Sequence, residues 1–145
     1  MKEIKKILVP VDYSDNSKKI LESAAFFAAK CDAAMHVLYV VQSFDDYSGF
    51  FVPHTPIAKF EEEMVSGAEA RMESFLVDYP TAAANVLCGD VAEEIVGYAE
   101  RQGFDLIIMG THGYKGIERV MFGSVADKVV KSAPCPVLTI NPYKE

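Results

Sequence analysis

The sequence has few cysteines, and none of them belongs to a recognisable motif. Cys31, Cys88 and Cys135 are scattered over 145 residues, and no two of them form a C-x-x-C pair. An odd, scattered set predicts neither a disulfide framework nor a zinc site, and it is typical of a reduced protein. A chain of this length buries most of its apolar surface without crosslinks. We therefore expect one cytoplasmic domain spanning residues 1–145.

Long apolar runs and an excess of positive charge are also missing. The apolar run before Asp12 is too short for the core of a signal peptide, and no stretch approaches the length of a membrane span. The net charge of −7 argues against a nucleic-acid or membrane partner, because binding phosphates over a wide face requires a basic patch. A bound nucleotide would therefore be held by local backbone donors, a few cations and a metal ion.

The apolar residues that are present alternate between two spacings. Short apolar runs predict strands at 7–11, 35–41, 83–87, 106–109 and 136–140. Apolar residues three and four positions apart predict helices at 17–31, 60–79, 91–102 and 124–133, the first capped by a residue within 14–16 and the third ended by Gly103. Strands joined by such helices are parallel with right-handed crossovers. The pattern predicts an α/β fold, a doubly wound sheet of five strands with helices on both faces.

One predicted connection, 42–56, is unusually long. It contains Phe44, Tyr47, Phe50 and Phe51 together with two prolines. Connections of this length are often functional. Two interpretations stay open: the aromatic residues cover the core or a dimer contact, or the segment forms a lid over a ligand.

A glycine-containing segment, 110–124, joins the fourth predicted strand to the fourth helix. Gly110, Gly113 and Gly123 would let the backbone approach an anion and present successive N–H groups to it. Ser124 and Asp127 fit a capping box, so the helix is predicted to open at Ser124 and to add its free N–H groups. Doubly wound sheets bind ligands at this edge, where the strand order reverses. The alternative is that these glycines only end a strand and form a turn.

Two common nucleotide motifs are absent. The sequence contains no G-x-x-x-x-G-K-[ST], which excludes a P-loop. The first strand–helix turn, 12–17, has no glycine, which excludes the Rossmann dinucleotide fingerprint.

The spacing Gly110-x2-Gly113-x9-Gly123-Ser124 instead resembles the ATP-binding signature of the universal stress protein family. Segments 7–12, 37–40, 89–95 and 134–138 are similar to that family as well, so the resemblance spans nearly the whole chain. It implies the adenine nucleotide alpha hydrolase-like fold, with strand order 3-2-1-4-5. It also implies ATP as the ligand, with Mg²⁺ or Mn²⁺, and a homodimer formed through the last strand.

The resemblance also implies roles for individual residues. Pro10, Val11 and Asp12 would line the adenosine end, and the backbone of Val40 would contact the adenine edge. Met109 and Gly110 would lie under the ribose. The phosphates would meet donors from four residues, Gly113, Gly123, Ser124 and Val125.

His112 also lies in this loop, and either phosphate contact or a bond to the backbone would explain it. Many family members carry a basic residue directly after the second glycine, whereas this chain has Tyr114 followed by Lys115.

Asp12 allows two interpretations without the resemblance. A charge at the end of a buried strand needs a partner, so it either caps a local turn with Ser14 or accepts from a ligand hydroxyl. His36 and His54 have no second ligand at metal spacing, and no protein metal site is predicted.

These patterns favour an ATP-binding regulatory or stress-response protein with weak or absent hydrolysis, because a backbone cradle stabilises ground and transition states alike. A slow ATPase that acts as a switch is the second hypothesis. A nucleotide-free dimeric signalling domain is the third, invited by Asp12, Asp15 and Asp90, but it leaves the glycine loop unexplained.

Overall fold

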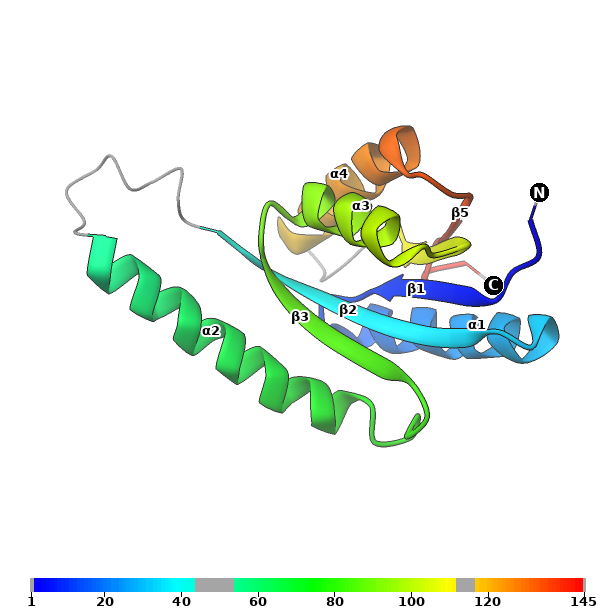
Figure 1. The fold of residues 1–145 in the computed structure, drawn as a ribbon, viewed down its shortest axis with the longest axis horizontal. Coiled ribbons are helices and arrows are strands. Elements are labelled where there is room, and N and C mark those ends of the chain that lie inside the picture. The colour runs from blue at the N-terminus through cyan, green and yellow to red at the C-terminus, as the bar shows by residue number, and fades with distance from the viewer. Residues whose placement is uncertain (1, 44–53, 112–116, 145) are drawn as a thin grey trace.

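The computed structural model of the chain describes residues 2–43, 54–111 and 117–144, with the side chains of 54–58 and 117–122 excluded. Strands and helices alternate along it (Figure 1). In chain order they are β1 (Lys6–Pro10), α1 (Asp15–Cys31), β2 (Ala34–Gln42), α2 (His54–Phe75), β3 (Ala83–Gly89), α3 (Val91–Gln102), β4 (Leu106–Gly110), α4 (Ile117–Ser132) and β5 (Val137–Ile140).

The five strands form one parallel sheet in the order β3-β2-β1-β4-β5, which confirms the predicted fold and strand order. Leu8 in the central strand pairs with His36 on one side and Ile107 on the other. The chain order reverses between β1 and β4, so their carboxyl ends meet at the switch point of the sheet.

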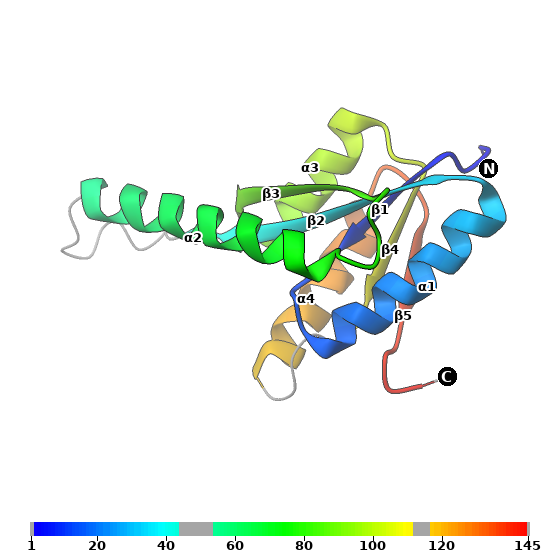
Figure 2. The same cartoon turned by 90° about the horizontal axis from the view of Figure 1, so that it is seen from below.

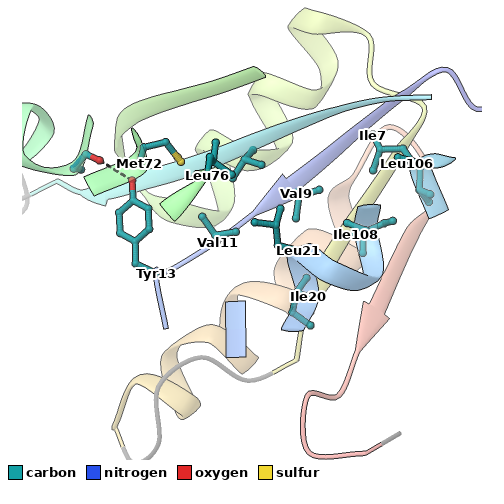
Figure 3. Close-up of a cluster of buried hydrophobic side chains, with 14 of the residues drawn as sticks. Ile7, Val9, Val11, Tyr13, Ile20, Leu21, Met72, Leu76, Leu106 and Ile108 are labelled. Atoms are coloured by element: carbon teal, nitrogen blue, oxygen red, sulfur yellow. Dashed lines mark hydrogen bonds between the residues drawn. The ribbon is translucent and has the colours of Figure 1, made fainter. Parts of the chain in front are cut away.

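Helices cover both faces of this sheet. In Figure 1, α3 and α4 lie above it and α1 and α2 below it, and Figure 2 shows the second pair from its own side. The reason is the alternation of side chains along a strand: Ile7 and Val9 pack with α1 and α2, whereas Leu8 packs with α3 and α4. Figure 3 shows the first of these two cores.

Local sequence signals define several helix ends. Ser14 is the N-cap of α1, and its Oγ accepts from the backbone N–H of Ser17 at 3.1 Å. Asp90 caps α3 in the same way, accepting from the N–H of Glu93 at 3.1 Å. Gly103 ends α3 with φ of 68°, as predicted, because glycine adopts this left-handed conformation without a Cβ penalty.

The predicted bounds of α2 were wrong at both ends. The helix begins at His54 and ends at Phe75, so the predicted connection of 42–56 is shorter than the sequence indicated. Apolar spacing marks only the part of a helix that packs, and Pro56 falls in the first turn, where proline is tolerated. The four aromatic residues at 44, 47, 50 and 51 lie outside the described residues, so both interpretations of them stay predictions.

The predicted start of α4 was also wrong. The helix begins at Ile117, so Ser124 lies inside it and is not its N-cap. The capping-box pattern is short and also fits helix interiors, whereas 117–122 contains no proline or glycine to stop a helix from forming earlier.

Candidate functional site

The predicted adenosine-end residues lie together at the carboxyl edge of the sheet. Val11 follows β1 and donates its N–H to the carbonyl of Leu38 at 2.9 Å, which continues the pairing toward Val40. Val11, Val40 and Met109 are 4%, 7% and 0% exposed. Val11 packs into the core on the α1 and α2 side of the sheet, whereas Val40 and Met109 pack into the core on the α3 and α4 side. Pro10 and Gly110, also buried, end the neighbouring strands β1 and β4.

Asp12 is held in the turn that leads into α1. Its Oδ1 accepts three hydrogen bonds: from the N–H of Ser14 at 2.9 Å, from the Ser14 hydroxyl at 2.5 Å and from the Ser17 hydroxyl at 2.6 Å. The Asp12 N–H donates to Ser17 Oγ at 2.9 Å. Asp12 Oδ2 has no hydrogen-bond partner within the part of the chain that the structure describes. The turn with Ser14 is thus present, and one carboxylate oxygen is left over.

Tyr13, next to Asp12, has φ of 65°, a left-handed conformation that is unusual for a residue with a Cβ. Its hydroxyl donates to the carbonyl of Ala68 in α2 at 2.7 Å, and its ring is 6% exposed. Burial raises the pKa of Tyr13 far above its ordinary value and Tyr39 adds to the rise, while Arg71 lowers it. The phenol therefore stays protonated and acts as a donor. The sequence offered one overlooked signal here, an aromatic residue in a turn without glycine.

The two described ends of the glycine loop meet. The Thr111 N–H donates to the carbonyl of Ile140 at 2.9 Å, which extends the β4–β5 pairing by one residue. On the other side of the loop, a Cβ built on Gly123 would lie 3.3 Å from the carbonyl oxygen of Thr111. Glycine at position 123 therefore permits the close approach of α4 to the end of β4. His112 and Gly113 lie outside the described residues, and their predicted roles stay predictions.

Because α4 begins at Ile117, Ser124 and Val125 present different groups to a ligand from those predicted. Both residues lie inside the helix, where backbone N–H groups are used by the helical ladder. The free N–H groups of α4 belong to its first turn, which begins at Ile117. The exposed hydroxyl of Ser124 is the polar group that this residue presents.

An acidic contact at the end of β2 was not anticipated. The Ser43 hydroxyl donates to Glu61 Oε1 in α2 at 3.2 Å, and the Ser43 N–H donates to the carbonyl of Gly89 at 2.9 Å. In the sequence Glu61 is simply the first of three consecutive glutamates, 61–63. Only the fold brings it to the end of β2.

Comparison with known proteins agrees with this architecture. The model of the universal stress protein family matches residues 3–141. The chain belongs to the universal stress protein family. It is 37% identical to the universal stress protein MJ0531 of Methanocaldococcus jannaschii, over 97% of this chain and 85% of that protein. The solved structure of MJ0577, a universal stress protein of the same organism, superposes with a TM-score of 0.80 at 26% identity, covering 97% of each chain.

Two more distant family structures share the fold. A universal stress protein in complex with cAMP has a TM-score of 0.64 at 18% identity, and it matches 97% of this chain and 98% of its own. The universal stress protein of Archaeoglobus fulgidus in complex with dAMP has a TM-score of 0.56 at 23% identity, and it matches 97% of this chain and 100% of its own.

Other parts of this family member lie away from the switch point. A groove of about 410 Å³ between α2 and β3, lined partly by Met72, Leu76, Tyr79 and Val86, contains none of the predicted site residues.

His36 lies in β2, with its Nε2 2.9 Å from the hydroxyl of Tyr98. Within residues 2–43, 54–111 and 117–144, no three His, Cys, Asp or Glu side chains gather in a way that could hold a metal ion. No helix in these ranges is long and apolar enough to span a membrane.

Proposed function

We propose that this universal stress protein binds an adenine nucleotide, ATP with Mg²⁺ or Mn²⁺, between the carboxyl ends of β1 and β4. The observation that carries the proposal is Asp12 Oδ2 at the switch point, which has no hydrogen-bond partner among the described residues. Asp12 follows β1 and Thr111 follows β4, and these two strands are neighbours in the sheet, so both residues lie at the switch point. A carboxylate oxygen near a segment whose glycines would present backbone N–H groups would suit a ligand with hydroxyls at one end and phosphates at the other.

The class of ligand follows from the same chemistry and from the family. Family structures have been solved with cAMP and with dAMP, which supports an adenine nucleotide rather than another phosphorylated compound. The net charge of −7 disfavours a free triphosphate at long range, so a divalent cation would reduce the repulsion. Because the described residues form no metal cluster, the cation would be carried mainly by the phosphate oxygens.

The proposed activity is binding with weak or absent hydrolysis, as suits a cytoplasmic regulatory or stress-response protein. Asp12 Oδ1 already accepts three hydrogen bonds from Ser14 and Ser17, so this oxygen is occupied in holding the turn. Donors that hold the phosphates equally in ground and transition states raise affinity without raising turnover.

The proposal includes a homodimer formed through β5. This strand ends the described sheet, and Val137, Leu138 and Ile140 are only partly buried in the single chain. An edge strand with partly exposed apolar residues is normally covered or paired. Pairing with a second copy would cover it.

The direct test is to denature freshly purified protein and to identify any released adenine nucleotide by chromatography. In parallel, adding Mg-ATP to nucleotide-free protein should raise the melting temperature, because a ligand that binds only the folded state stabilises it. Absence of both released nucleotide and thermal shift would contradict the proposal. Single-turnover hydrolysis well above the uncatalysed rate would instead favour the slow ATPase.

A further inference from the structure

Tyr13 adopts a backbone conformation that its residue type does not favour. With φ of 65° it occupies the left-handed region, which glycine enters freely and aromatic residues seldom do. The whole turn 12–17 lacks glycine. Contacts from elsewhere in the fold must therefore hold Tyr13 in place.

Those contacts come from α2 and β2. The ring of Tyr13 stacks on Tyr39 with centroids 4.3 Å apart, and it meets the edge of Phe75 at 5.3 Å. The guanidinium of Arg71 lies over the same ring, 4.9 Å from its centre. Figure 3 shows the hydroxyl of Tyr13 bonded to the backbone of α2, at the carbonyl of Ala68. All four contacts join the turn to segments that are distant along the chain.

The left-handed residue also determines how the turn uses the Asp12 carboxylate. The chain reverses at Tyr13, and the N–H and hydroxyl of Ser14 and the hydroxyl of Ser17 all converge on Oδ1. With Oδ1 occupied three times, Oδ2 is the oxygen that remains for a ligand. A turn of ordinary φ at position 13 would direct the Ser14 N–H elsewhere and release the carboxylate from this arrangement.

We infer that Tyr13 is a positioning residue for the nucleotide site, which α2 holds in the left-handed turn so that Asp12 Oδ2 can accept from a ribose hydroxyl. This rests on the proposed function. It adds that selection of the ribose hydroxyls depends on a side chain anchored in α2, a helix to which the sequence assigned no part in the site. A merely structural tyrosine would affect stability alone.

The test compares two ligands in several variants. Affinities for Mg-ATP and for Mg-2′,3′-dideoxy-ATP are measured by calorimetry with the wild type, Tyr13→Ala and Tyr13→Phe. We expect the wild type to prefer ATP about tenfold, a ratio equivalent to about 1.4 kcal/mol and typical of one hydrogen bond. Tyr13→Ala keeps the Cβ that disfavours positive φ but loses the ring contacts, so the turn should leave the left-handed region; this should lower the preference to near one, with little change in dideoxy-ATP affinity. Tyr13→Phe keeps the ring contacts and should retain most of the preference.

Matched measurements separate positioning from folding. Tyr98→Phe removes a tyrosine hydroxyl from the other face of the sheet and should leave the ligand preference unchanged. If Tyr13→Ala does not fold, Tyr13→Leu replaces it, because leucine also disfavours positive φ and lacks the hydroxyl and the aromatic contacts. A crystal structure of the folded variant gives a readout independent of ligands: the three hydrogen bonds to Asp12 Oδ1 should no longer all form.

The possible results are distinguishable. An unchanged preference in Tyr13→Ala, or three intact hydrogen bonds to Oδ1 in its crystal structure, would overturn the positioning role while leaving nucleotide binding in place. A wild type that binds both nucleotides equally would overturn the assignment of Oδ2 to a ribose hydroxyl, and the inference with it. A wild type that binds neither contradicts the proposed function itself.

Discussion

Gly123 in α4 lies against the backbone carbonyl of Thr111, so closely that a Cβ on Gly123 would be 3.3 Å from that oxygen. The two residues belong to opposite ends of the glycine loop. Their contact brings α4 against the backbone at the carboxyl end of β4. The spacing of glycines in the sequence thus has a steric reason at position 123, independent of any ligand.

A pair of glycine-to-alanine substitutions tests this contact. Alanine in place of an exposed helix-interior glycine stabilises by about 0.5–1 kcal/mol, and this is the result expected for Gly67→Ala, because nothing lies within 4 Å of the added Cβ. Gly123→Ala should fall short of that gain by about 1 kcal/mol, because α4 must move away from Thr111. Urea unfolding of both variants measures the difference. Equal gains would mean that Gly123 is not closely packed.

The carboxylate at the switch point gives a second prediction. In Asp12→Asn the amide oxygen can keep the three bonds from Ser14 and Ser17, while the NH₂ group takes the place of Oδ2. We expect about tenfold weaker binding of Mg-ATP, because a charge-assisted hydrogen bond is replaced by a weaker one.

Asp15→Asn is the matched control for this substitution. The side chain of Asp15 is 98% exposed and lies only three residues along the chain. Its substitution should leave affinity within about twofold, since it removes a charge near the site but no ligand contact. Equal losses in the two variants would indicate a general effect of charge.

His36 makes the stability of the fold depend on pH. Its pKa lies below the ordinary value of 6.5, first because burial penalises the charged ring and second because Lys6 is nearby. Neutral Nε2 can accept from the Tyr98 hydroxyl at 2.9 Å, while Asn85 donates to the same hydroxyl oxygen at 3.4 Å. Protonated His36 would bring a second donor to that oxygen.

The direction of this dependence follows from proton binding. Because the folded state binds the proton more weakly, the free energy of unfolding is unaffected well above pH 6.5. It falls as the pH drops through this value and levels off below the folded pKa. The slope should reach at most about 1.4 kcal/mol per pH unit, the limit for one proton. Urea unfolding between pH 8 and 5 should show this loss in the wild type and in Tyr98→Phe but not in His36→Gln. An identical slope in His36→Gln would assign the effect to other groups.

The proposed dimer can be tested at one backbone N–H. Ile107 and Thr111 donate to the carbonyls of Pro136 and Ile140, so these residues and Leu138 between them face β4, and the N–H of Thr139 faces the outer edge. Thr139→Pro should weaken dimerisation about tenfold or more by removing that donor, without breaking the β4–β5 ladder.

Sedimentation equilibrium measures the effect, and Thr139→Ala is the control that changes the side chain but keeps the N–H. Dimerisation unchanged by Thr139→Pro would place the interface elsewhere. A wild type that is monomeric at all concentrations would contradict the dimer itself.

Much of the fold could be predicted because its signals are local. Apolar runs identified every strand to within two residues, and Gly103 identified the end of α3 because glycine adopts the left-handed conformation without a Cβ penalty. The resemblance to the universal stress proteins supplied the strand order, which depends on contacts far apart in the chain.

The bounds of α2 and α4 could not be predicted in the same way. A helix shows apolar spacing in its sequence only where it packs against the core. The first turns of α2 lack this spacing, so the sequence did not predict them. The capping-box pattern at Ser124 is three residues long, and it carries too little information to outweigh the helical preference of the segment before it.

The sequence by itself determined that this is a doubly wound α/β protein with a glycine loop after its fourth strand and an aspartate after its first. Only the tertiary structure decided how that aspartate is used. Three donors occupy Asp12 Oδ1 and leave Oδ2, because Tyr13 is held in a left-handed turn by Ala68, Arg71 and Phe75. These residues lie more than fifty positions away along the chain, and contacts at that distance form only once β1, β2 and α2 have packed together.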